Sequence, residues 1–557
     1  MRSLDSGTVP NLFIHALAGA GKTYLLDTMS QELIARNFTV VVTAASGVAA
    51  LNLKTGQTFH SAFGIRPNAS DEPTERHAYL NINRKSKLAR KLRDMQALVV
   101  DEIAMLDRFL YEMAEATVRN LYAAQDDDEH AKACLFFAGK GNILCGDFGQ
   151  LLPVVPGGDR ATVVHRAMSA SPLVKEHFYH MCLAENVRAR RAGEELNDPE
   201  GAAAYAAFLR DLHDNIPPGT APITTDREAD IVAGDADIPQ ARGNAATEGA
   251  HLPTHVGGHP FALRDGTPEE LMDFVYGDLR ARWHDTTWLA ERAIVAGKYE
   301  DVDFYNDAMT TRYLAAREAA GREVEALDLY SADTLADDTV SDMDAQADAD
   351  TVTAEDLATR GRGHVPPHHL RVAPGMPLML LRNVNMGRGL CNGTKLIAVK
   401  VTRAVIMCRI VSGPRAFSDE LVPIFRCSLR CEASHGFPAW ERLQFPVRVC
   451  WAHTVHKAQG QTLKCVGGDL RTPPFAHAML YVLCGRVGHA SRIRIILPPS
   501  GHTANPVYIE AMPDAFMPLG ALTRARVTRT LNEILCPTRN AVHSKSVGSE
   551  ESSSDTE

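Results

Sequence analysis

The chain has 557 residues, of which 45% are hydrophobic and 23% are charged, and its formal net charge is −10 at pH 7. This length predicts about three or four domains, and the composition is that of a globular protein with sizeable cores. No run of about 18 apolar residues occurs, which argues against a membrane span, and the first residues have no signal-peptide core.

The negative charge is concentrated in two segments. Nine acidic residues and no Lys or Arg lie between Asp333 and Asp356, and the tail that ends at Glu557 is also acidic. Neither segment has apolar periodicity, so both are predicted to be disordered. Without them the chain is close to neutral, which leaves room for a basic groove that binds nucleic acid.

A phosphate-binding loop is the first pattern along the chain. The apolar run 11–16 predicts a buried strand, and a helix with apolar residues at Leu25, Leu26, Met29 and Leu33 is expected after Lys22-Thr23. Backbone N–H groups of the glycine-rich turn between them can face a polyphosphate, Lys22 supplies a cation, and the Thr23 hydroxyl suits Mg²⁺. The residues expected to hold the nucleotide are Gly19, Ala20, Gly21, Lys22 and Thr23. Ala16 replaces the first glycine of the usual motif, and the alternative is a glycine turn with a chance Lys-Thr.

Further short apolar runs alternate with helical patterns. The runs 39–45, 97–102 and 142–146 predict strands of a parallel sheet that is covered on both faces. Asp101 and Glu102 end the second of these runs, at the sheet edge where ligands bind. Asp101 is suited to hold Mg²⁺ through water, and Glu102 to orient or deprotonate the attacking water.

Gln150 follows the run 142–146 and can sense a γ-phosphate, because its amide both donates and accepts hydrogen bonds. Small residues over 43–50 and the run 55–63 follow the strand 39–45. They would let a nucleic-acid backbone approach, with phosphate contacts and base stacking. The candidate residues are Thr43, Thr58, Phe59 and His60. A helix packed tightly through alanines is the alternative, and the residues alone do not decide between the two.

The middle of the chain is less regular. A polar insertion is expected over 65–95, and its basic run is interpreted as a solvated helix face, with nuclear import or DNA contact as alternatives. Helices are expected over 198–214 and 268–285, separated by a long loop over 218–265. From residue 377 short strands predict a small β-barrel module at about 395–440.

Eleven cysteines are scattered along the chain, which favours reduced, buried thiols in an intracellular protein. The spacing Cys427-x3-Cys431-x3-His435 is compatible with zinc, but strand and turn residues are the favoured interpretation.

The order of these motifs resembles helicase superfamily one. The element over 55–63 is similar to one typical of the Pif-one-like (petite integration frequency) DNA helicases, and the chain resembles the versions in Helitron transposons and large DNA viruses. In the second half, 183–188 resembles motif IV, 454–463 motif V and 480–487 motif VI. The resemblance covers most of 11–190 and 290–498.

This resemblance implies an α/β fold with two RecA-like parallel-sheet P-loop domains and an SH3-like insertion. It implies a monomer that uses ATP and Mg²⁺ to move 5′→3′ on single-stranded DNA and to unwind duplex junctions in replication, repair or recombination. Arg188 and Arg486 would reach the γ-phosphate as arginine fingers. The residues that would couple DNA contact to the nucleotide are Thr454, His456, Lys457 and Gln459.

The expected domains are 1–180, the first RecA-like domain with the insertion 65–95, and 181–538, the second. The second domain carries insertions at 218–265 and 333–360, and 539–557 is an acidic tail. Nuclear localisation, in the host nucleus if the chain is viral, is expected, with the cytoplasm as an alternative.

Two departures from the family pattern keep a second function open. Motif VI has Gly485 before Arg486 where a serine is usual, and no adenine-reading glutamine precedes the first strand. A nucleotide-switched DNA-binding or replication-accessory protein with little unwinding is therefore the alternative, and an RNA-directed helicase would share the same chemistry.

Overall fold

The computed structural model describes most of the chain between residues 9 and 511. The described residues are 9–65, 80, 82–122, 131–155, 157–214, 252–322, 326–336, 352–360, 365–413, 415–431, 437–499, 503, 505–508 and 511. The tail 539–557, the segment 218–251 and the acidic residues 337–351 lie outside them. Within the described part, no helix has the length and apolar character that crossing a membrane requires.

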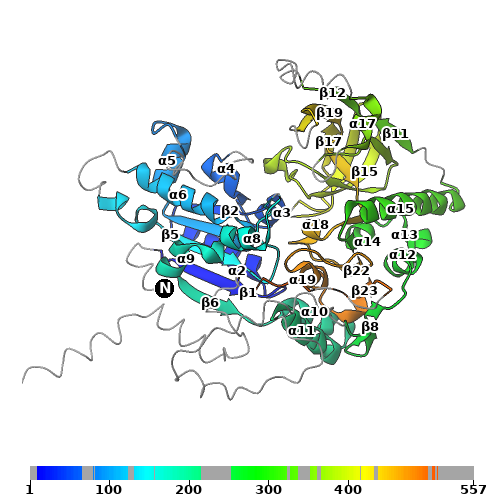
Figure 1. Ribbon diagram of the computed structural model, residues 1–557, viewed down its shortest axis with the longest axis horizontal. Coiled ribbons are helices and arrows are strands. Elements are labelled where there is room, and N and C mark those ends of the chain that lie inside the picture. Colours follow the sequence, from blue (N-terminus) through cyan, green and yellow to red (C-terminus); the bar gives the residue numbers. More distant parts are fainter. Residues whose placement is uncertain are drawn as a thin grey trace, which may run out of the picture.

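A six-stranded parallel sheet forms the first half, in the order β3-β2-β4-β5-β1-β6. Its strands are β1 (Leu12–Ala16), β2 (Val40–Ala44), β3 (Gln57–Thr58), β4 (Ala97–Asp101), β5 (Gly141–Gly146) and β6 (Tyr179–Leu183). Its helices are α2 (Lys22–Ala35), α3 (Gly47–Leu51), α4 (Phe59–Phe63), α5 (Lys87–Asp94), α6 (Arg108–Asn120), α8 (Arg160–Arg166) and α9 (Pro172–His177) (Figure 1). The four predicted strands agree with β1, β2, β4 and β5, because each is a buried apolar run.

Two boundaries in this half differ from the sequence prediction. The expected domain limit at residue 180 falls inside β6, which pairs with β1 over its whole length. The expected insertion 65–95 includes α5, whose Ala89 and Leu92 are fully buried in the core of the first sheet together with Met95. Lys87, Arg90 and Lys91 of its basic run are exposed, in agreement with a solvated helix face.

A five-stranded parallel sheet forms the second half, in the order β21-β10-β22-β23-β9. Its strands are β9 (Ala262–Leu263), β10 (Arg292–Ala296), β21 (Ala452–Thr454), β22 (Cys465–Asp469) and β23 (Ile493–Ile496). The helices of this half are α12 (Pro268–Tyr276), α13 (Leu279–Arg282), α14 (Thr286–Ala290), α15 (Tyr299–Ala319), α18 (Val455–Ala458) and α19 (Met479–Cys484). The predicted loop 218–265 is therefore wrong at its end, because β9 adds an edge strand to this sheet.

Helices α10 (Val187–Leu196) and α11 (Pro199–His213) follow β6 and pack against each other. Helix α11 also contacts α19, so the chain crosses from the first sheet to the second at this point (Figure 1). The short hairpin of β7 (His255–Val256) and β8 (His259–Pro260) lies against α11 and the 3-10 turn η8 (Ala490–Arg492).

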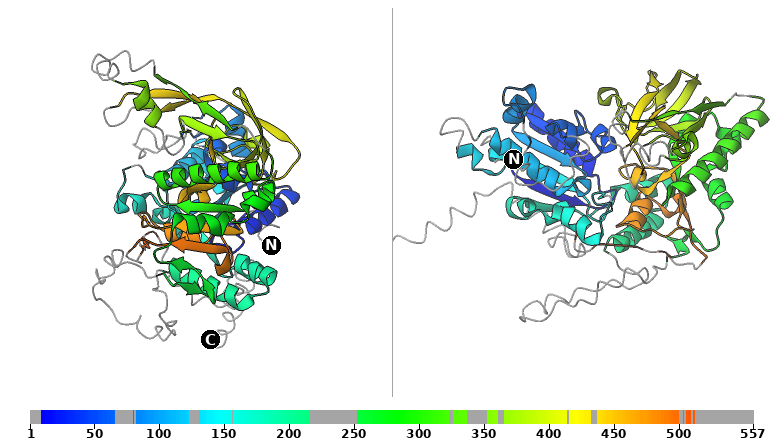
Figure 2. Two further views of the ribbon diagram at one scale, coloured as in Figure 1. Left: turned by 90° about the vertical axis from the view of Figure 1, so that its right-hand side faces the viewer. Right: turned by 45° about the horizontal axis from the view of Figure 1, so that its top comes forward.

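Antiparallel strands form a separate layer beside the second parallel sheet (Figures 1 and 2). Five strands pair in the order β17-β16-β15-β14-β20, three in the order β12-β19-β18, and β11 pairs with β13. They are β11 (Leu327–Tyr330), β12 (Ala332–Leu335), β13 (His369–Val372), β14 (Pro377–Leu380), β15 (Lys395–Val401), β16 (Val405–Ile410), β17 (Leu421–Phe425), β18 (Cys427–Cys431), β19 (Trp440–Gln444) and β20 (Val447–Val449). The module thus extends beyond the expected 395–440 on both sides, because β14 and β20 complete its larger sheet.

The acidic segment is ordered at its start, which corrects the prediction of disorder there. Asp333 lies in β12, and its two carboxylate oxygens accept hydrogen bonds of 2.9 and 2.8 Å from Arg442 of β19. The Arg442 side chain is fully buried and also donates to the carbonyl oxygens of Pro366 and Leu357. A bidentate, fully hydrogen-bonded pair offsets the cost of burying both charges.

Candidate nucleotide and nucleic-acid site

The loop between β1 and α2 has the backbone that a phosphate-binding loop needs. Gly19 and Gly21 have φ values of 83° and 87°, in the left-handed region that favours glycine. Lys22 begins α2, is buried, and donates from Nζ to the Ala16 carbonyl oxygen at 3.1 Å. The loop therefore brings backbone N–H groups and one ammonium group, that of Lys22, to the N-terminus of a 14-residue helix.

The donor set beside this loop fits a hydrated Mg²⁺ ion. The Thr23 hydroxyl donates to Asp101 Oδ2 at 2.8 Å, which joins the start of α2 to the end of β4. Burial, and then the charge of Glu102, raise the pKa of Asp101 to about 6. A hydroxyl and a carboxylate at this edge are the oxygen ligands that Mg²⁺ prefers.

Glu102 has a strained backbone at the same edge. Its φ is 52°, a conformation that costs about 1–3 kcal/mol for a residue other than glycine and that is found at functional sites. Its N–H group donates to Asp101 Oδ1 at 2.8 Å, and its side chain is almost fully buried. Gln459, from the segment after α18, approaches Glu102 Oε2 with Nε2 at 3.5 Å.

Asp147, which follows β5, is the centre of a buried network that the sequence interpretation missed. Its Oδ2 accepts hydrogen bonds from Gln150 Nε2 at 2.9 Å and from the Tyr481 hydroxyl at 3.1 Å, and it lies 4.0 Å from Lys22 Nζ. The Tyr481 hydroxyl also accepts from the N–H group of Ala18 at 2.8 Å. One carboxylate thus connects the phosphate loop, the predicted γ-phosphate sensor and α19.

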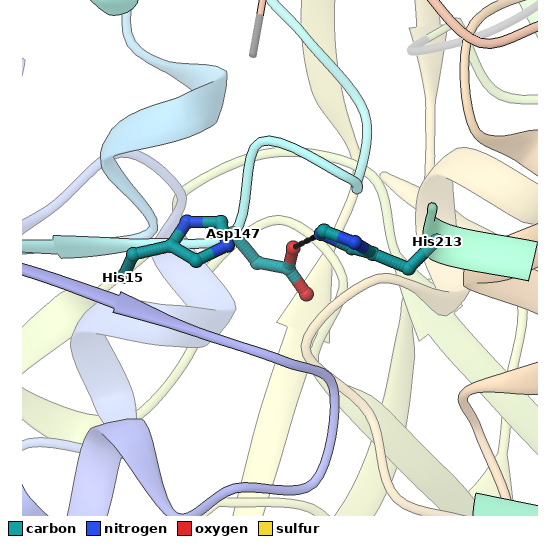
Figure 3. A group of neighbouring side chains, drawn as sticks. All are labelled: His15, Asp147 and His213. Atoms are coloured by element: carbon teal, nitrogen blue, oxygen red, sulfur yellow. Dashed lines mark ion pairs between the residues drawn. The ribbon is translucent and has the colours of Figure 1, made fainter. Parts of the chain in front are cut away.

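Two histidines flank Asp147 (Figure 3). His213, the last residue of α11, lies with Nε2 3.3 Å from Asp147 Oδ1 and Nδ1 2.8 Å from Asp214 Oδ1. Burial alone would lower the pKa of His213, but the two carboxylates raise it to about 9, whereas burial lowers the pKa of His15 to about 3. The imidazolium of His213 and Lys22 keep the pKa of Asp147 well below its usual range, although burial opposes this. The ion pair ties α11 to the first sheet.

This ion pair predicts a pH-dependent stability. A folded-state pKa near 9 against 6.5 in the unfolded chain stabilises the fold below pH 6.5, and this contribution of about 3 kcal/mol is lost as the pH rises through 9. His213→Gln should flatten the decline in the free energy of unfolding between pH 6.5 and 9.5, measured by denaturant titration. His177→Gln, a change at a more exposed histidine, should keep the wild-type slope; parallel curves for wild type and His213→Gln would contradict the ion pair.

Arg188 lies directly against the phosphate loop. Its N–H group donates to the Gly19 carbonyl oxygen at 3.1 Å, and a Cβ on Gly19 would lie 2.9 Å from the Cβ of Arg188. The guanidinium donates to the carbonyl oxygen of Gly485 and, at 2.9 Å, to the Thr462 hydroxyl. Burial, and then the charge of Arg486, lower the pKa of Arg188 to about 10.

Arg486 is buried and connects the segments that resemble motifs V and VI. It donates from Nε to the Val482 carbonyl oxygen at 2.7 Å and from Nη1 to those of Ala458 and Gln461 at 3.2 Å. Its side chain is therefore held by backbone carbonyls in this structure, close to Arg188 and facing away from open solvent.

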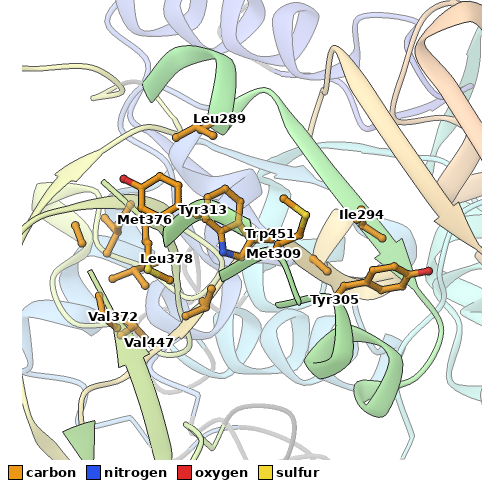
Figure 4. Close-up of a cluster of buried hydrophobic side chains, with 14 of the residues drawn as sticks. Leu289, Ile294, Tyr305, Met309, Tyr313, Val372, Met376, Leu378, Val447 and Trp451 are labelled. Carbon is orange, nitrogen blue, oxygen red and sulfur yellow. The ribbon is translucent and has the colours of Figure 1, made fainter. Parts of the chain in front are cut away.

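The segment of motif V is anchored by the core beneath it (Figure 4). Asn306 Oδ1 accepts from the N–H groups of Trp451 and Ala452, both at 2.9 Å, and the Trp451 indole donates to the Thr310 hydroxyl at 3.3 Å. These bonds fix β21, and β21 ends at Thr454.

A small pocket lies beside β21. Its lining includes Arg448, Thr454 and Lys457, together with Tyr299 and Met379. Lys457 donates to Asn392 Oδ1 at 2.6 Å, and burial lowers its pKa and that of His456, which is not part of the lining. Arg448, Thr454 and Lys457 thus bring two cations and a hydroxyl to a lining that is otherwise mostly apolar.

The predicted nucleic-acid residues of the first half are only partly suited to that role. Phe59 is fully buried and packs on Phe63 and Tyr111, so the prediction that it stacks on bases is wrong for this structure. Thr43 is also fully buried and donates to the Val99 carbonyl oxygen at 2.9 Å, which holds the sheet together. Thr58 caps α4 through a bond from the Ser61 N–H group, and His60 is partly exposed.

Several residues that complete the site could not be recognised from the sequence pattern. Asp147 follows a predicted strand and could have been selected by the rule that selected Asp101. Tyr481 and Thr462 lie in segments that the resemblance covers, but their partners are hundreds of residues away. His213 carries no sequence signal, because its role depends on the place where α11 ends.

Two parallel sheets, a phosphate loop and an acidic Mg²⁺-type edge define a P-loop nucleotide-binding protein of the RecA-like class. A family model described as PIF1-like helicase matches residues 3–219, and one described as the 2B domain of DNA helicase Pif1 matches residues 362–401. The chain is therefore similar to PIF1-like helicases over these two segments. Its narrower resemblance to Helitron and viral versions stays a prediction.

Curated relatives match over parts of their length. The ATP-dependent DNA helicase PIF4 of Trypanosoma brucei brucei is 38% identical over 25% of this chain and 16% of its own. The ATP-dependent DNA helicase Pif1 of a Psychrobacter species is 32% identical over 34% of this chain and 26% of its own. The zebrafish (Danio rerio) PIF1 is 21% identical over 87% of this chain and 58% of its own. The chain thus spans about a sixth to somewhat over half of the length of these relatives.

Solved structures agree in fold. A Bacteroides Pif1 helicase in complex with ADP-AlF3 and single-stranded DNA matches with a TM-score of 0.53 and 18% identity, over 92% of each chain. The Pif1 helicase of Candida albicans matches with a TM-score of 0.51 and 19% identity, over 90% of this chain and 95% of that one.

Proposed function

We propose that this chain is an ATP-dependent DNA helicase that couples ATP hydrolysis to movement on single-stranded DNA and to unwinding of duplex junctions. One observation carries the proposal. Lys22, Thr23, Asp101 and Glu102 lie at the edge of the first sheet, and Arg188 contacts the phosphate loop from the far side. The family-model matches and the names of the similar helicases support the same conclusion.

The residues would divide the chemistry as follows. The N–H groups of the loop and Lys22 hold the phosphates, while Thr23 and Asp101 hold Mg²⁺, which neutralises the charge that develops on the transferred phosphoryl group. Glu102 accepts a proton from the attacking water, and Gln150 orients that water. The buried Gln150 Oε1 has no hydrogen-bond partner among the described residues, so it can take this role without breaking a bond.

Arg188 and Arg486 would act as arginine fingers after exchanging their carbonyl partners for the γ-phosphate. Such an exchange would move the segment 485–488 relative to the phosphate loop. Because Gln459 approaches Glu102, the same movement would reach the proposed DNA contacts Thr454 and Lys457, which line the pocket beside β21, and His456, which does not line it. Hydrolysis would thus alternate the grip on single-stranded DNA.

Steady-state ATP hydrolysis with and without single-stranded DNA tests this function. Wild type should be strongly stimulated by DNA and should displace a strand from a forked duplex, whereas Lys22→Ala should do neither, because the phosphates lose their cation. Lys54→Ala, at a lysine 71% exposed shortly after α3, is the matched control and should behave as wild type.

The remaining outcomes separate the alternatives. ATP binding without DNA-stimulated turnover would favour a nucleotide-switched DNA-binding or replication-accessory protein. Stimulation by RNA but not by DNA oligonucleotides would favour an RNA-directed helicase. Turnover by Lys22→Ala equal to wild type would contradict both the phosphate loop and the helicase proposal.

The proposal also includes the properties that the resemblance implies. These are movement in the 5′→3′ direction, action as a monomer, a role in replication, repair or recombination, and nuclear localisation. The SH3-like character of the antiparallel module is a proposal of the same kind. Strand displacement from substrates with 5′ or 3′ tails would determine the polarity directly.

A further inference from the structure

A second group of metal-type ligands lies away from the nucleotide site. Asp198, the cap of α11, His259 of β8 and His489 before η8 have their ligand atoms within 4.8 Å of one another. Both imidazole rings lie within hydrogen-bond distance of the same carboxylate oxygen. Asp198 Oδ2 is 2.8 Å from His259 Nε2 and 3.1 Å from His489 Nε2.

This geometry is close to that of a zinc site. Two ligand atoms that are each about 2.1 Å from a tetrahedral Zn²⁺ lie about 3.4 Å apart, somewhat farther than the two carboxylate–imidazole distances of 2.8 and 3.1 Å here. Two imidazole nitrogens and one carboxylate oxygen are a donor set that Zn²⁺ accepts readily. The side chains of Asp198 and His259 are 32% and 34% exposed, so an ion can enter from solvent and water can complete the coordination.

The surrounding structure leaves space for the group. A Cβ on Gly201 would lie 2.3 Å from Asp198 Oδ2 and 2.9 Å from His489 Nε2, so any other residue would fill the position between the ligands. A Cβ on Gly257, in the β7–β8 turn, would in its turn lie 2.8 Å from the Gly201 Cα. Two glycines thus allow the hairpin and α11 to bring the three ligands together.

The second nitrogen of His489 is also held. Its Nδ1 accepts a hydrogen bond from the Ser491 N–H group at 3.2 Å and lies 2.8 Å from the Ser491 hydroxyl, so Ser491 orients the ring and leaves Nε2 facing Asp198. The positive charge of Arg492, which acts on His489, is partly neutralised because Arg492 pairs with Glu195 at 2.9 Å.

The other cluster of this kind, His15, Asp147 and His213, is a poorer metal site. Lys22 Nζ lies 4.0 Å from Asp147, and both Asp147 oxygens already accept hydrogen bonds from Gly149, Gln150 and Tyr481. An ammonium group at that distance repels a cation, so this cluster serves as an internal control.

We propose that Asp198, His259 and His489 bind one Zn²⁺ ion that clamps α11 and the β7–β8 hairpin to the segment following Arg486. The ion displaces the protons that the imidazoles share with Asp198 and leaves one or more positions to water. His489 is three residues from Arg486, so the clamp would fix the end of motif VI. The proposal does not depend on the helicase activity.

Zinc binding by the metal-stripped full chain tests the proposal, in competition with a chromophoric chelator. Wild type should bind one equivalent. Asp198→Asn and His259→Gln should each weaken binding by more than about 100-fold, and Ser491→Ala by about tenfold. Asparagine caps a helix as well as aspartate does, so Asp198→Asn should keep the thermal midpoint of the metal-free protein, and only wild type should gain thermal stability from Zn²⁺.

Two controls make the test decisive. His213→Gln, in the other cluster, and Cys427→Ser, at a thiol, should bind zinc as wild type does. Substitution with Co²⁺ should give weak visible bands without the intense near-ultraviolet absorption of a thiolate ligand. No stoichiometric binding by wild type, unchanged binding by Asp198→Asn, or a thiolate band would each overturn the site.

Discussion

Glu102→Gln is expected to lower the rate of ATP hydrolysis by about 10²–10⁴-fold, the usual contribution of a general base. The substitution keeps the size of the side chain and its contact with Gln459, because a glutamine oxygen can still accept a hydrogen bond. Two carboxylates at the end of β4, those of Asp101 and Glu102, can take a proton from water, and the substitution removes the second of them. The affinity for ATP should change by less than about tenfold, because Lys22, Thr23 and Asp101 are untouched.

Single-turnover hydrolysis and nucleotide-binding measurements on the same protein check this expectation. Glu32→Gln makes the same chemical change on the exposed face of α2, where Glu32 pairs with Arg36, and should leave turnover at the wild-type rate. Turnover by Glu102→Gln within threefold of wild type would remove Glu102 from the chemical step. Loss of ATP binding would instead indicate that Glu102 supports the site structurally.

Arg188→Lys is expected to reduce the turnover number by about 10³-fold or more, the range measured for arginine fingers. Lysine keeps the charge but has no planar fork, so it cannot hold the Thr462 hydroxyl and the Gly485 carbonyl oxygen together, nor span a phosphate in the same way. ATP binding should be largely retained, because the Arg188 N–H group that contacts Gly19 belongs to the backbone.

Arg190 offers a matched control on the same helix. Its side chain is 55% exposed and pairs with Glu185 and Glu194 on the surface, so Arg190→Lys should leave turnover unchanged. DNA-stimulated hydrolysis and the thermal midpoint should be measured for both variants. A lower thermal midpoint with normal turnover for Arg188→Lys would show that Arg188 is a structural link between the halves and does not act on the phosphate.

The residues that hold the nucleotide could be predicted from local sequence pattern. A strand, a glycine-rich turn and a helix that begins at Lys22 are consecutive in the chain, so local pattern was enough to place them. Thr23 and Asp101 are 78 residues apart, yet their contact was also predictable, because parallel strands bring their carboxyl ends to one edge.

Burial and long-range pairing were decided only by the tertiary structure. The aromatic ring of Phe59 is equally suited to a base or to a core, and the packing of Tyr111 and Phe63 around it selects the core. Asp333 belongs to an acidic run that resembles a disordered linker, and only the partner Arg442, 109 residues away, holds it in a strand. The positions of α11 and of the β7–β8 hairpin decide which side chains meet. They bring His213 to Asp147, and they bring together Asp198, His259 and His489. Local sequence records the propensity of a segment, whereas these contacts depend on where distant segments meet, and a single sequence carries no direct signal of that.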